Sequence, residues 1–156
     1  MNIELVRINI NQAEKLWKMQ VDAFQELYKK YKDTETSPAT EPVERIIERL
    51  KQNFTYYYFI KVEGVDVGAI RVIDFKDDSQ PKRISPIFIL DEFRRKGYAQ
   101  KAIRLVEDIH GNSNWELETI LQEKGNCSLY EKMGYHQTGK TEQINDKMTL
   151  VFYKKG

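Results

Sequence analysis

Residues 84–111, ISPIFILDEFRRKGYAQKAIRLVEDIHG, are the stretch that decides the fold. Segment 84–90 is apolar and rich in β-branched residues, which predicts a buried strand. From Ala99 onward the apolar residues recur at helical spacing, and Gly111 ends the run. The residues on that helical face are Ala99, Ala102, Ile103, Val106 and Ile109. The stretch therefore predicts a buried strand, a glycine-containing loop and an amphipathic helix.

The loop between this strand and this helix predicts a phosphate site. Between Asp91 and Arg104 there are five basic residues against two acidic ones. The first N–H groups of a helix have no internal partner and lie at the positive end of its dipole, so they bind anions readily. Gly97 lets the backbone approach a ligand closely and tolerates a positive φ. The alternative is an ordinary strand–turn–helix connection.

Two motifs resemble the acyl-CoA-dependent N-acetyltransferases of the GNAT superfamily. Arg94, Gly97 and Ala99 match its pyrophosphate signature of Gln or Arg, two residues, Gly, one residue, and Gly or Ala. Residues 126–135, NCSLYEKMGY, resemble its last motif, where Asn, an aliphatic–Tyr pair and Gly-aromatic follow the fifth strand. The resemblance implies an α/β (α+β) fold: a mixed, mostly antiparallel sheet of about six to seven strands, flanked by helices and splayed between strands four and five.

The same resemblance implies that acetyl-CoA is the cosubstrate, with pantetheine in the gap between the splayed strands. Asn126 would hold the pantetheine arm, and a backbone N–H around residues 88–90 would meet the oxyanion. The residues implied in cofactor binding are Phe88, Ile89, Leu90, Arg94, Arg95, Lys96, Gly97, Tyr98, Ala99, Asn126 and Lys132.

Tyr130 is the implied general acid, since its hydroxyl would protonate the departing thiolate. Two alternatives stay open from the residues alone. Tyr130 is a core aromatic whose hydroxyl bonds to the backbone, and Asn126 caps a short helix that begins at Cys127. Cys127 itself is expected to be a buried apolar cysteine, because only a helix start lies near it to activate a thiolate.

A base or a dry pocket must remove a proton from the acceptor, because an alkylammonium has a pKa near 10.4. Many relatives place a Glu on the fourth strand, where this chain has only Ser85 as a polar residue. The remaining candidates are Glu118, Glu116 and Asp74, and the first two share one strand face. Glu118 is the predicted base. The alternative for Glu118 itself is an ordinary surface charge, and the alternative for proton removal is a water chain to bulk solvent.

The rest of the chain predicts the order β-α-α-β-β-β-α before residue 111 and further strands after it. Asn11 and Glu14 have the spacing of a capping box. The helix that follows carries an apolar and aromatic stripe, which is expected to be core. Residues 32–41 and 138–147 are polar and predict loops, and residues 148–153 predict a closing strand. Glu63 and Gly64 predict the turn of a hairpin, and Gly68 predicts a bulge inside its second strand, residues 65–75. The stripe consists of Leu16, Trp17, Gln20, Phe24, Leu27, Tyr28 and Tyr31.

Composition predicts one domain, residues 1–156, of an ordinary globular protein. The formal net charge of +1 provides no global field for nucleic acid or membranes. A single cysteine excludes an internal disulfide and suits a reducing cytoplasm, and no signal peptide or membrane span is expected. One cysteine and two histidines without metal-ligand spacing predict no metal site. His110 is expected at a helix C-terminus, where a cation interacts well with the dipole.

The predicted function is direct transfer of an acetyl group from acetyl-CoA to a primary amine, on a small molecule or a peptide. The alternative is a non-catalytic, regulatory acyl-CoA-binding domain, suggested by the missing carboxylate on the fourth strand. In such folds the acceptor lies near the loops 32–41 and 138–147, where Glu35 is one candidate to attract a cation. Proteins that resemble this chain commonly form homodimers, so a homodimer is possible for this chain.

Overall fold

The computed structural model describes residues 2–156 and consists of a seven-stranded sheet flanked by helices. The strand order is β1-β2-β3-β4-β5-β7-β6. The strands are β1 (Ile3–Arg7), β2 (Thr55–Val62), β3 (Val65–Ile73), β4 (Lys82–Ile89), β5 (Trp115–Ile120), β6 (His136–Gln143) and β7 (Thr149–Lys155). The helices are α1 (Ala13–Tyr31), α2 (Val43–Lys51), α3 (Tyr98–His110) and α4 (Lys124–Lys132). In the part of the chain that is described, no helix has the length and apolar character that a membrane crossing requires.

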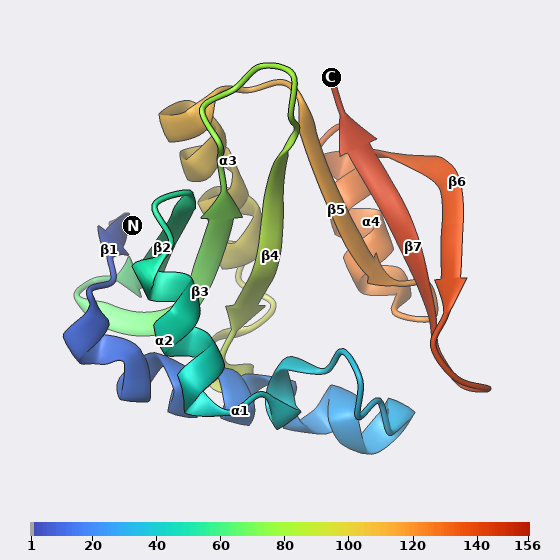
Figure 1. The fold of residues 1–156 in the computed structure, drawn as a ribbon, viewed down its shortest axis with the longest axis horizontal. Coiled ribbons are helices and arrows are strands. Elements are labelled where there is room, and N and C mark those ends of the chain that lie inside the picture. Colours follow the sequence, from blue (N-terminus) through green and yellow to red (C-terminus); the bar gives the residue numbers. More distant parts are fainter. Residues whose placement is uncertain (1) are drawn as a thin grey trace.

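The sheet is split between β4 and β5. These strands are the parallel pair of the sheet, and their register holds only Lys82 opposite Trp115 and Arg83 opposite Glu116. Beyond these two pairs the strands diverge, so that β4 and β5 meet at the top of Figure 1 and separate toward the bottom. All the other strand pairs are antiparallel. The predicted mixed, mostly antiparallel sheet with a splay between strands four and five is confirmed.

A bulge in β4 lies where the splay opens. Between the pairs Ile70–Ile87 and Val72–Ile84, β4 contains two residues, Ser85 and Pro86, opposite the single Arg71 of β3. Arg71 is buried, and its guanidinium donates a hydrogen bond to the Ser85 carbonyl at 3.0 Å. Burial lowers the pKa of Arg71 to about 10, so the side chain stays charged at neutral pH. Arg71 thus satisfies a carbonyl that the bulge removes from the ladder.

Both faces of the sheet are buried at β2 and β3, whereas β5 and β7 bury one face only, in alternation along the strand. On β2, Tyr57 and Phe59 pack with α1 and α2, while Tyr58 and Ile60 pack in the core that contains α3. The helical face predicted from residue 99 onward is confirmed at Ala102, Ile103 and Val106, which are fully buried, whereas Ile109 is exposed. Gly68 is needed for close packing, because a Cβ there would lie 2.1 Å from the Phe88 carbonyl oxygen. The register shift falls next to it, between Ile60 and Lys61 of β2.

Two local predictions are wrong, the loop at residues 138–147 and the capping box at Asn11 and Glu14. Residues 138–147 do not form a loop alone: β6 ends at Gln143, and its residues are polar because every one of them is exposed at the sheet edge. The capping box consists of Asn9, the N-cap of a short 3-10 turn (Ile10–Gln12), and Gln12 within that turn, rather than Asn11 and Glu14. The side chain of Asn9 accepts from the Asn11 amide at 3.0 Å.

His110 is the last residue of α3, as predicted, but its side chain is buried and makes the contacts of a neutral ring rather than those of a cation at a helix end. Its Nδ1 lies 2.8 Å from Asp74 and its Nε2 lies 2.9 Å from the Tyr58 hydroxyl. A neutral ring donates to the carboxylate and accepts from the hydroxyl, so both contacts are satisfied. Burial lowers the pKa of His110, although the hydrogen bond to Asp74 acts in the opposite direction.

We expect the free energy of unfolding to fall when the pH is lowered from about 7.5 to about 5. Because the folded pKa of His110 lies below the ordinary 6.5, the unfolded chain binds the proton more tightly. The stabilising effect of the neutral ring is therefore full above pH 6.5 and is lost as the pH falls through the folded value. Denaturant titrations across this range measure it. His110→Gln should flatten the profile, and His136→Gln, at an exposed position on β6, should leave it unchanged.

Candidate active site

The loop before α3 presents unpaired backbone amides to a cavity of about 500 Å³. Arg95 and Gly97 have φ values of 65° and 79°, and such left-handed residues in a turn direct successive N–H groups into an anion-binding concavity. Within residues 2–156, the amides of residues 95–100 have no hydrogen-bond partner. A Cβ on Gly97 would meet no atom within 4 Å, so the space beside it is open. The phosphate site predicted from the sequence therefore has the geometry that it needs.

Arg94 has a structural role in addition to its place on the cavity wall. Its Nε donates to the Ile89 carbonyl and one of its terminal nitrogens to the Ala23 carbonyl, both at 2.8 Å. These bonds fasten the loop to β4 and to α1. Arg95, Gly97, Tyr98 and Ala99 also line the cavity.

Three of the predicted cofactor residues, Leu90, Lys96 and Lys132, lie outside the cavity lining. Lys96 and Lys132 are both exposed, and neither belongs to the walls of this cavity. Their charges therefore lie on the surface around the site rather than in it.

The backbone of β4 supplies the other polar groups at the gap. The Leu90 amide donates to the Val67 carbonyl at 2.8 Å, so it is not free to meet an oxyanion. Backbone groups of alternate residues point to opposite edges of a strand, so the Phe88 amide also faces β3. The amides of Ile87 and Ile89 then face the gap, and both residues line the cavity. Within the predicted range 88–90, only the Ile89 N–H is therefore available to meet an oxyanion. The Ile87 N–H, outside that range, is also available.

Tyr130, on α4, lies on the walls of two cavities, the one described above and a second one across the gap. Its side chain is 7% exposed, and its hydroxyl has no hydrogen-bond partner within residues 2–156. Tyr130 is thus a core aromatic, as the alternative expected, but its hydroxyl forms no hydrogen bond to the backbone of the described residues. Burial raises the pKa of Tyr130 to about 12, so the hydroxyl keeps its proton at neutral pH and can donate it.

Asn126 is exposed and also lines both cavities. It does not cap the helix, because α4 begins at Lys124 and its N-cap is Glu123. Cys127 is buried as predicted, and its sulfur contacts the carbonyls of Ile120 and Leu121 at 3.8 Å. The helix starts earlier than the sequence suggested. Its first turn contains Gly125 and Asn126, which are poor helix formers and therefore do not indicate a helix in the sequence.

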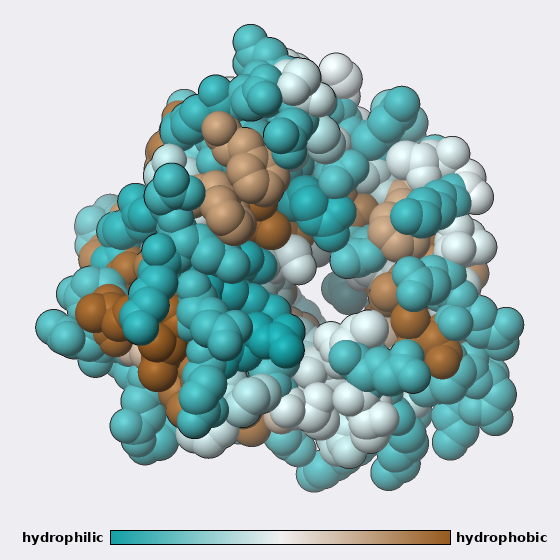
Figure 2. Space-filling view, in the orientation of Figure 1, coloured by the Kyte–Doolittle hydropathy of each residue, from teal (hydrophilic) through white to brown (hydrophobic). Residues whose placement is uncertain are grey.

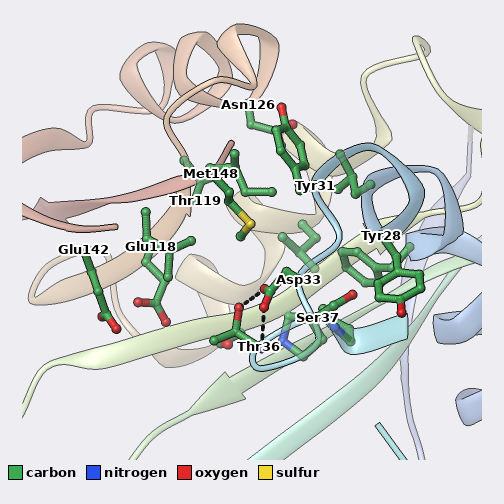
Figure 3. A pocket seen from close by; sticks show the side chains of 18 of the residues that line it. Tyr28, Tyr31, Asp33, Thr36, Ser37, Glu118, Thr119, Asn126, Glu142 and Met148 are labelled. Atoms are coloured by element: carbon green, nitrogen blue, oxygen red, sulfur yellow. Dashed lines mark hydrogen bonds between the residues drawn. The ribbon is translucent and has the colours of Figure 1, made fainter. Parts of the chain in front are cut away.

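The second cavity, of about 300 Å³, lies between α1, β4, β5 and the β6–β7 hairpin. Figure 2 shows this face of the molecule hollowed at its centre, and Figure 3 shows the residues around the cavity. Three carboxylates line it, and none of the described residues in its wall is Lys, Arg or His. The carboxylates are Asp33, Glu118 and Glu142. This composition favours a positively charged occupant.

Of the three predicted base candidates, only Glu118 reaches this cavity. Arg83 donates to Glu118 at 3.1 Å and to Glu116 at 2.9 Å, so one guanidinium is shared by two carboxylates. Glu116 does not line the cavity, and Asp74 is bonded to His110 on the other half of the sheet. Within the described chain no group of three His, Cys, Asp or Glu side chains could hold a metal ion.

The loop 32–41 contributes Asp33 to the cavity, whereas Glu35 stays outside it. Asp33 accepts hydrogen bonds from the amides of Glu35 and Thr36 at 2.9 Å and from the Thr36 hydroxyl. Figure 3 shows the bonds between Asp33 and Thr36. The far end of the loop is held by Glu41, whose carboxylate receives two bonds from Arg49, at 2.7 and 2.8 Å. This loop is therefore a fixed wall.

Sequence reasoning missed Asp33, Glu142 and the residues of the α1 stripe that line the cavities. Leu16 and Gln20 are core residues as expected, but Phe24 and Leu27 line both cavities. No short-range signal marks Asp33 or Glu142, because each looks like a solvated charge in a polar segment. Their meeting depends on the packing of α1 against the β6–β7 hairpin, where the Asn145 side chain donates to the Tyr31 carbonyl at 2.8 Å.

Comparisons with known proteins agree with this geometry. The model of the acetyltransferase (GNAT) family matches residues 16–135. No curated protein matches the chain. PaiA N-acetyltransferase from Thermoplasma acidophilum, solved with coenzyme A, has a TM-score of 0.71 and 15% identity, and 100% of both chains is covered.

Two further solved structures are similar. Spermidine N-acetyltransferase from Vibrio cholerae, with CoA and spermine, has a TM-score of 0.75 and 15% identity over 97% of this chain and 93% of that one. Microcin C7 self-immunity acetyltransferase MccE, with acetyl-CoA and AMP, has a TM-score of 0.72 and 16% identity over 97% and 90%. At these identities the likeness shows the fold. Because the family model spans most of the sequence, the chain belongs to the acetyltransferase (GNAT) family.

Proposed function

We propose that residues 1–156 act as one domain that transfers an acetyl group from acetyl-CoA to a primary amine. The observation that carries the proposal is the meeting of two cavities at the splay, with Tyr130 on the walls of both. One cavity has unpaired amides for an anion, and the other has carboxylates for a cation. A thioester and an amine that enter from opposite sides would come together there.

The residues present fit acetyl-CoA as the donor. The amides of residues 95–100 would hold the pyrophosphate, and the β4 backbone and Asn126 would hold the pantetheine arm. When bound, acetyl-CoA supplies an activated acyl group. The Ile87 or Ile89 amide stabilises negative charge on the carbonyl oxygen, and the Tyr130 hydroxyl gives its proton to the thiolate.

Glu118 is our proposal for the group that receives the amine proton. It stands two residues beyond the closed end of the splay, so it would act through water rather than by direct contact. Its bond with Arg83 leaves it an acceptor, since a carboxylate has room for about four hydrogen bonds. Release of the proton to bulk through the same water is consistent with the open cavity.

The acceptors named for similar proteins support an amine. The Vibrio cholerae neighbour is a spermidine N-acetyltransferase, and another, RimL, is an alpha-N-acetyltransferase of ribosomal protein L7/L12. A small-molecule or peptide amine is therefore proposed for this chain. A homodimer and a cytoplasmic location stay predictions.

Release of free CoA thiol from acetyl-CoA, followed with a panel of primary amines, tests the proposal. We expect amine-dependent release and an acetylated product by mass spectrometry. Tight CoA binding without thiol release on any amine would favour the regulatory acyl-CoA-binding domain instead. Absence of CoA binding would contradict both functions.

A further inference from the structure

The acceptor cavity keeps a negative balance after its own cations are counted. Arg83 is divided between Glu116 and Glu118, so that group of three side chains retains one negative charge. The Nζ of Lys140 lies 4.5 Å from the centre of the Phe152 ring. Among the described residues, Lys140 forms no ion pair with a cavity carboxylate. Glu142 has no hydrogen bond or ion pair within residues 2–156.

Two of the three carboxylates, Glu118 and Glu142, lie together on one side of the cavity. In the sheet register, Glu118 is opposite Phe152 and Glu142 is opposite Leu150. Phe152 and Leu150 are two residues apart on β7, so all four side chains share one face of the sheet. Figure 3 shows Glu118 and Glu142 at one end of the cavity and Asn126 at the other. The cavity therefore has an acidic end.

The opposite end is where the acceptor would react. Ile87, Asn126 and Tyr130 line both cavities there, and the Tyr130 hydroxyl has no hydrogen-bond partner within residues 2–156. The partners of Ile87 and Arg83 on β3, Ile70 and Ile73, are three residues apart, so at about 3.3 Å per strand residue Ile87 lies roughly 10 Å from Arg83 at the closed end of the splay. Between the two ends the wall is largely apolar, with Ile84, Met148 and Leu150.

We infer that the acceptor is an extended diamine-like molecule with a second cationic group, which Glu142 binds at the acidic end while the reacting amine lies beside Tyr130. An apolar spacer matches the walls between the two ends. Asp33 and Glu118 add to the negative potential without being required as direct contacts. This inference rests on the proposed acetyl transfer and narrows its substrate class.

Three probes of equal chain length test the inference: 1,6-diaminohexane, hexylamine and 6-aminohexanoate. All three have a primary amine and a six-carbon chain. At the far end of the chain the first has a second cation, the second has no charge and the third has an anion. For acetylation we expect kcat/KM to be at least about fivefold higher for the diamine than for hexylamine, and lowest for the carboxylate. Added salt should reduce the preference, because the acidic end is partly open to solvent.

Glu142→Gln should reduce the ratio of the diamine to the hexylamine kcat/KM by about the same factor, through KM. Glu48→Gln is the matched control. It removes the same charge at an exposed position on α2 that lines neither cavity, so the ratio should stay at its wild-type value. Calorimetric binding of the diamine and of hexylamine to the protein saturated with CoA gives a second readout that needs no turnover.

The outcomes separate the two levels of the proposal. Equal kcat/KM for diamine and hexylamine, or an unchanged ratio in Glu142→Gln, would overturn the inference and leave acetyl transfer intact. A diamine that binds more tightly than hexylamine but releases no thiol would support the acidic end and contradict the transfer reaction. Equal calorimetric affinities without turnover would overturn both.

Discussion

Gly97→Val should weaken CoA binding roughly 100-fold or more, the largest effect expected of any single substitution in this protein. The Cβ of Gly97 would project into open space, which is the space that the diphosphate needs beside the amides of residues 95–100. Valine also has to adopt the glycine φ of 79°, which costs about 1–2 kcal/mol for a residue with a branched side chain. Isothermal titration with CoA measures the loss.

Gly64→Val separates the loss of the ligand from backbone strain. Gly64, in the β2–β3 turn, has the same φ of 79° and equally open surroundings. It belongs to neither cavity, so the control should lose a similar amount of stability and keep its CoA affinity. If Gly97→Val bound CoA as tightly as the control, the loop before α3 would not be the diphosphate site.

Tyr130→Phe should lower kcat by about 100-fold or more while the affinity for CoA changes little. The substitution removes only a hydroxyl that has no partner within residues 2–156, so neither packing nor a protein hydrogen bond is lost. The thiolate would then have to leave without a positioned acid. Single-turnover kinetics with saturating acetyl-CoA measure the chemical step apart from product release.

Tyr56→Phe is the matched control for this prediction. Tyr56, on β2, lines neither cavity, and the loss of its hydroxyl should leave kcat and KM as they are in the wild type. Equal kcat for Tyr130→Phe and the control would reduce Tyr130 to a wall residue between the two cavities. A rise in the KM for the amine alone would instead indicate that Tyr130 binds the acceptor.

The strand, loop and helix of residues 84–111 were predictable because their signals are local. Apolar alternation or helical spacing reports burial, and Gly97 marks a position where the backbone must be left-handed. The same holds for Tyr130, whose place in the chain follows from its motif. Where local signals are weak, as in the polar strand β6, the sequence did not distinguish an edge strand from a loop.

What the amino-acid sequence by itself determined is the order of the elements and the conformation of the loop before α3, since both follow from neighbouring residues. The tertiary structure alone decided which groups meet. The bulge beside Arg71 and the splay set which β4 amides face the gap, and the packing of α1 against the β6–β7 hairpin brings Asp33 and Glu142 into one cavity. Those contacts join segments about a hundred residues apart, and no local pattern encodes a pairing that depends on the free energy of the whole core.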